Sequence, residues 1–106
     1  LGIALDMDNN KLYFSKNGDW SNGSGAWGSS TFNAGTGAID ISAASAEDMM
    51  FSVSVEGGSS NIHGNFGSPA EAISSGNTDG NGYGNFEFAV PSGFFSLCTK
   101  NLAEYG

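Results

Sequence analysis

The strongest constraint on the fold is a two-residue alternation of apolar and polar side chains, interrupted by segments rich in glycine, serine and asparagine. In residues 2–8, Ile3, Leu5 and Met7 alternate with smaller or acidic residues, and residues 11–16 continue the pattern. Successive side chains of a strand point to opposite faces, so each segment is predicted to be a half-buried β-strand. Asn17 and Gly18 follow, and both residue types adopt positive φ at low cost, which predicts a tight turn.

The same alternation predicts further short strands at residues 39–42, 50–55, 61–66, 86–90 and 94–98. In residues 50–55 we expect the side chains of Phe51, Val53 and Val55 to point inward. Residues 21–38 and 70–84 have no regular period and are predicted to be long loops. A single helical turn is expected at residues 43–48, with Ser45 as its N-cap, and residues 99–106 form a polar tail. The pattern predicts an all-β antiparallel β-sandwich without a substantial helix.

Length and charge restrict the classes of function. A chain of 106 residues forms one small domain, which we place at residues 1–106. Three Lys and Arg residues against eleven Asp and Glu residues give a net charge of −8, which argues against nucleic acid and anionic membranes as partners. No stretch approaches the roughly 18 consecutive apolar residues needed for membrane insertion. Because the chain opens at Leu1 in what resembles the middle of a strand, we expect a C-terminal fragment of a longer domain.

The residues that most often carry out catalysis are scarce. Cys98 is the only cysteine and His63 the only histidine, so a nucleophilic pair would require these two side chains to meet. Cys98 lies in an apolar run, where thiols are usually packing groups. The acidic pairs, Asp6 with Asp8 and Glu47 with Asp48, are interpreted as solvated faces and turns. We therefore predict no catalytic residue, no metal ligand and no cofactor.

One loop has a weak similarity to calcium-binding loops. Residues 77–82 read Asn-Thr-Asp-Gly-Asn-Gly, but Asn77 replaces the first aspartate of the pattern and no glutamate stands at its twelfth position. A loop rich in turns is the favoured interpretation, and calcium binding is left open.

Four aromatic residues fall in the glycine-rich connections: Trp20, Trp27, Phe32 and Tyr83. Exposed aromatic side chains in loops stack on sugars or anchor protein interfaces, so these four are the candidate ligand-binding residues. The competing interpretation is that they fold back and cover the open end of the sandwich.

Three stretches of the chain, in the expected order, resemble a SPRY domain, which is a β-sandwich interaction module. Residues 2–20 match its pattern at Gly2, Leu5, Asp6, Leu12, Phe14, Asn17 and Gly18. Residues 48–67 are similar to a later hairpin of the family, which ends in Asn-Phe-Gly. Residues 81–106 resemble the stretch that follows SPRY cores in many phage and marine viral structural proteins, although Val90 replaces a proline.

The resemblance implies a SPRY-like or jelly-roll-like sandwich that lacks its N-terminal strands. It also implies a non-enzymatic structural or recognition module at a virion surface, tail or fibre, or in another extracellular setting. The expected partners are neighbouring protein subunits in an oligomeric assembly, or a receptor or glycan on a host surface. The alternative is a carbohydrate-binding module that uses the loop aromatics. The open sheet edge at residues 2–8 is expected to pair with another strand.

Overall fold

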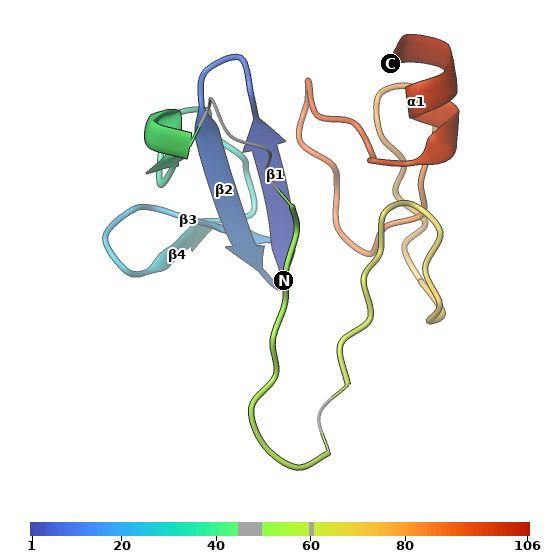
Figure 1. Cartoon of the computed structure of the whole chain (residues 1–106), viewed down its shortest axis with the longest axis horizontal. Coiled ribbons are helices and arrows are strands. Elements are labelled where there is room, and N and C mark those ends of the chain that lie inside the picture. Colours follow the sequence, from blue (N-terminus) through green and yellow to red (C-terminus); the bar gives the residue numbers. More distant parts are fainter. Residues whose placement is uncertain (45–49, 60) are drawn as a thin grey trace. The chain divides into compact units, whose positions relative to one another are not determined.

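The computed structural model describes residues 1–44, 50–59 and 61–106. The chain divides into two compact units, Leu1–Asp48 and Met49–Gly106. All named strands lie in the first unit, and the α-helix lies in the second (Figure 1).

The first unit is built on an antiparallel sheet of five strands, in which β1 to β4 are neighbours in sequence order. Its strands are β1 (Gly2–Asp6), β2 (Lys11–Lys16), β3 (Asp19–Ser21), β4 (Trp27–Ser29) and β5 (Ile39–Asp40). The last of these pairs with β2 at Lys11 and Leu12. The strands predicted at residues 2–8, 11–16 and 39–42 are thereby confirmed, with slightly shorter first and last strands. The strands β3 and β4 were not expected, because residues 19–29 have no clear alternation.

The turns of this sheet follow the predicted chemistry. Asn17 and Gly18 between β2 and β3 have φ values of 52° and 88°, and Asn10 before β2 has a φ of 54°. Asp6 fixes the β1–β2 turn, because its carboxylate accepts hydrogen bonds from the Asn9 amide side chain at 2.9 Å and the Asn9 backbone N–H at 3.0 Å. Both hydrogen bonds lower the pKa of Asp6, and the bond from the Asn9 side chain has the larger effect.

The register assigns each side chain of the hairpin to a face of the sheet. Ile3 pairs with Phe14 and Leu5 with Leu12, whereas Ala4 pairs with Tyr13. The buried side chains are those of Ala4, Tyr13 and Ser15, with 6%, 3% and 4% of their surface exposed. Thus the covered face of the hairpin is the more polar one. The apolar side chains of the alternating pattern lie on the face that is more exposed.

The second unit holds its chain in turns and an isolated bridge between Asn77 and Phe86. The strands predicted at residues 50–55, 61–66, 86–90 and 94–98 are not formed among its described residues. Phe51, Val53 and Val55 do not point inward, since about half of the surface of each is exposed. The alternation is present, but no strand among the described residues pairs with these segments. An extended segment becomes a strand only through such pairing of its backbone hydrogen-bonding groups.

The C-terminal residues also differ from the prediction. Instead of a polar tail, Thr99–Tyr105 form the helix α1, closed by the Gly106 N–H, which donates to the Leu102 carbonyl at 3.1 Å. A 3₁₀ turn, η1, spans Ser42–Ala44. The rest of the helical turn predicted at residues 43–48, including Ser45, lies outside the described residues.

The antiparallel, strand-based architecture is therefore confirmed, and the described residues form an open sheet of five strands and a short C-terminal helix. The second layer of the predicted sandwich, and the single domain over residues 1–106, remain predictions.

Candidate functional site

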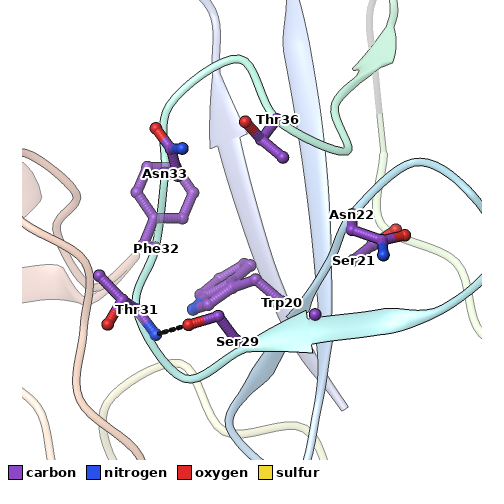
Figure 2. Close-up of a pocket in the computed structure, with 9 residues that line it drawn as sticks. Trp20, Ser21, Asn22, Ser29, Thr31, Phe32, Asn33 and Thr36 are labelled. Carbon is purple, nitrogen blue, oxygen red and sulfur yellow. Dashed lines mark hydrogen bonds between the residues drawn. The ribbon is translucent and has the colours of Figure 1, made fainter.

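A cavity of about 390 Å³ lies beside the covered face of the first unit, where β3, β4 and the segment after β4 meet (Figure 2). Trp20 and Phe32 provide its aromatic surface, and Gly28 contributes backbone. Six uncharged polar residues complete the lining: Ser21, Asn22, Ser29, Thr31, Asn33 and Thr36. None of the nine lining residues carries a formal charge.

Three aromatic rings, those of Tyr13, Trp20 and Phe32, pack together beside the cavity and fix the position of its wall. The Phe32 ring packs edge-to-face against Tyr13 and Trp20, with centroid separations of 4.9 Å and 5.1 Å. The Tyr13 hydroxyl also accepts a hydrogen bond from the Gly35 N–H at 3.0 Å, which ties the loop to β2. Trp20 pairs with Ser15, which places it on the same face as Tyr13. These contacts hold one face of the sheet under the loop of residues 30–37.

Short hydrogen bonds preorganise the polar lining. Ser29 Oγ accepts from the Thr31 N–H at 3.0 Å, and Asn22 Oδ1 accepts from the Ser24 N–H at 2.9 Å. The Thr36 N–H donates to the Asn33 carbonyl at 3.1 Å and closes a turn. Within the described part of the chain, the Asn33 side-chain amide and the Thr36 hydroxyl make no hydrogen bond, so both remain available to a ligand.

The cavity brings together two of the four aromatic residues predicted to bind a ligand. Trp20 and Phe32 line it, whereas Trp27 does not, and its side chain is 44% exposed on β4. Tyr83 belongs to the other unit, where its hydroxyl donates to Glu104 at 2.7 Å and the Lys100 ammonium lies 5.0 Å from its ring centroid. The carboxylate of Glu104 raises the pKa of Tyr83. Sequence reasoning missed the polar lining, because serine, threonine and asparagine occur throughout these loops.

The opposite face of the sheet is apolar and open. Ile3, Leu5 and Ile39 are 39%, 45% and 50% exposed, and by register they share this face with Leu12 and Phe14. Within the described sheet, β1 pairs only with β2, so its outer edge has no ladder partner. An unpaired backbone edge beside exposed aliphatic side chains is typical of a site for strand addition.

In the second unit the organising group is the buried carboxylate of Asp79. Its Oδ1 accepts hydrogen bonds from the backbone N–H groups of Asn81 and Tyr83, both at 2.9 Å. Its Oδ2 accepts from the Ser96 N–H, the Ser96 hydroxyl and the Asn101 amide, at 2.9, 2.8 and 2.7 Å. Burial acts to raise the pKa of Asp79, but these hydrogen bonds outweigh burial and hold it well below its usual range.

This network bears on the calcium-like loop at residues 77–82. Both Asp79 oxygens face N–H and O–H donors from the protein, which is the environment of a carboxylate that organises turns. Among the described residues, no group of three His, Cys, Asp or Glu side chains is placed to hold a metal ion.

His63 and Cys98, which would have to meet to form a nucleophilic pair, contact different side chains. His63 Nδ1 lies 2.6 Å from a carboxylate oxygen of Glu71. Ser96 Oγ lies 3.3 Å from Cys98 Sγ, and hydrogen bonding with Ser96 and with backbone N–H groups of α1 lowers the pKa of Cys98.

Comparison with family models, with curated proteins and with solved structures finds no match to this chain. The similarity to SPRY domains therefore rests on the sequence motifs alone. No helix in the described part of the chain has the length and apolar character needed to cross a membrane.

Proposed function

We propose that this protein is a non-enzymatic structural module that joins neighbouring subunits of an oligomeric assembly through the open side of its sheet. The observation that carries the proposal is the apolar face of β1, β2 and β5, which lies beside the unpaired edge of β1. We commit to a second copy of this chain as the partner, with the two β1 edges pairing antiparallel.

Pairing of the two β1 edges would stabilise the assembly in two ways. It would give hydrogen-bond partners to the outer backbone groups of β1 over Gly2–Asp6. It would also place Ile3 and Leu5 of the two copies side by side across the new strand pair, so that the aliphatic area between these side chains is removed from water. By register, Lys16 and Asp19 also lie on this face, but they are paired with each other across β2 and β3 and have opposite charges. Their charges therefore offset each other at this end of the apolar surface.

The finer part of the proposal is that the sheet is one layer of a SPRY-type β-sandwich in a virion-surface or extracellular attachment protein. The support is the sequence similarity at residues 2–20, together with the hairpin and Asn17-Gly18 turn that these residues form. The proposal that the module is not an enzyme is supported by the contacts of His63 and Cys98, which are made with different partners.

Sedimentation velocity over a range of protein concentrations tests the assembly. The wild-type chain should associate as concentration rises, and added salt should strengthen association because it screens the repulsion between copies with a net charge of −8. Leu5→Lys should keep the chain monomeric, since lysine on an edge strand opposes pairing.

Leu102→Lys is the matched control, because Leu102 is 56% exposed on α1 and is not part of the sheet. It should associate as the wild type does. A wild-type chain that stays monomeric at every concentration, or Leu5→Lys association equal to that of the wild type, would reject the proposal.

A further inference from the structure

The cavity beside Trp20 and Phe32 supports a second function, independent of subunit assembly. We propose that it binds a neutral carbohydrate, with a sugar ring against Trp20 and its hydroxyl groups hydrogen-bonded to Asn33 and Thr36. Trp20 lies on the covered face of the sheet with Tyr13, whereas the assembly surface occupies the opposite face.

The chemistry of the lining selects the class of ligand. With no Lys, Arg, Asp or Glu in the lining, the cavity has no group to neutralise a phosphate, a carboxylate or a cation. The amide of Asn33 and the hydroxyl of Thr36 are exposed and can hydrogen-bond to hydroxyl groups of a ligand, which a purely apolar ligand does not offer. A pyranose ring suits both the aromatic and the polar part of the lining. Its C–H face can stack on an aromatic ring, and its hydroxyl groups can hydrogen-bond to the polar side chains.

The geometry is consistent with such a ligand. Figure 2 shows the Trp20 ring at the bottom of the space, with Phe32 and Asn33 on one side and Thr36 at the far end. A volume of about 390 Å³ is within the range of small-molecule sites, roughly 300–1,000 Å³. Phe32 holds the Trp20 ring by an edge-to-face contact, which leaves the ring oriented before any ligand arrives.

Tryptophan fluorescence gives a direct test, because the chain has only two tryptophans and one lies outside the cavity. In Trp27→Phe, the emission of Trp20 should change saturably on titration with methyl glycosides of glucose, galactose or N-acetylglucosamine, or with their neutral disaccharides. In Trp20→Phe, the emission of Trp27 should not respond to the same sugars.

Isosteric variants test the polar contacts without removing an aromatic anchor of the fold. Thr36→Val in the Trp27→Phe background should weaken sugar binding by about 3- to 10-fold, the effect of one neutral hydrogen bond. Thr78→Val is the matched control in an exposed loop of the other unit and should leave the dissociation constant unchanged.

The proposal is overturned if none of these sugars changes Trp20 emission, or if Thr36→Val binds as tightly as its parent. A response that is equal for Trp20 and Trp27 would show nonspecific quenching and would also reject the site. The assembly variant Leu5→Lys should bind sugar normally, so failure of one proposal is distinguishable from failure of the other.

Discussion

The two units of this chain use the same sequence pattern with different results. In Leu1–Asp48, the alternating segments become strands because β1 and β5 each pair with β2 within one sheet. In Met49–Gly106, residues 50–55 alternate as regularly, yet they form no strand. The second unit is instead organised around the carboxylate of Asp79. Alternation alone is thus not sufficient to form a strand, because the extended segment also needs a paired neighbour.

The largest expected effect comes from removing the carboxylate that organises the second unit. Asp79→Asn replaces an acceptor oxygen by an amide, so that at least one buried N–H donor loses its partner, and we expect a loss of about 3 kcal/mol in stability. Amide hydrogen exchange should show lost protection near Asn81, Tyr83 and Ser96, with β1 and β2 unchanged. Asp8→Asn, at an exposed turn, is the control. Equal loss of protection in both units would contradict the conclusion that Asp79 organises the second unit alone.

A smaller effect is expected from the turn that sets the first sheet. Gly18 has a φ of 88°, where a Cβ atom is strained, so Gly18→Ala should cost about 1–2 kcal/mol. Chemical denaturation monitored at amides of β2 and β3 measures the change. Gly80→Ala is the control, because Gly80 has no positive φ and an added Cβ would make only an ordinary contact, 3.7 Å from Phe95 Cε1. Similar losses in the two variants would show that the turn does not limit the stability of the sheet.

The smallest effect is expected from mild acidification. The pKa of Asp79 is lower in the folded protein than in the unfolded chain, so its contribution is fully present above the unfolded value, near 4, and is lost as pH falls further. The second unit should therefore begin to lose stability below about pH 4. The pKa of Asp40 is lowered mainly by Lys11, whose ammonium lies 2.7 Å away, but this pair is partly exposed and screened by solvent. Acid titration followed by NMR should thus show weakening of the second unit before the first. Loss of the sheet first would reverse the order that we expect.

Much of the first unit could be predicted because its signals are local. The alternation in residues 11–16 and the φ preferences of Asn17 and Gly18 are properties of neighbouring residues, and they give β2 and its turn at the observed positions. The strand β4 was missed because its pairing with β3 depends on contacts rather than on alternation.

The candidate sites were only partly accessible to sequence reasoning. Trp20 and Phe32 could be selected as loop aromatics, but nothing in their spacing indicates that they meet in one cavity while Trp27 lies elsewhere. The importance of Asp79 was hidden for a similar reason, since Ser96 and Asn101 are far from it in sequence and reach it only in the folded chain.

The sequence by itself determined where the chain could extend and where it had to turn, because steric preferences of single residues and neighbouring pairs set φ and ψ. Tertiary structure alone decided which extended segments found a ladder partner and which face of the sheet was covered. Phe32 returns over Tyr13 and Trp20, and thereby buries the more polar face of the hairpin while Ile3 and Leu5 stay exposed. The physical reason is that burial depends on which surfaces meet, and this depends on contacts between residues distant in the chain.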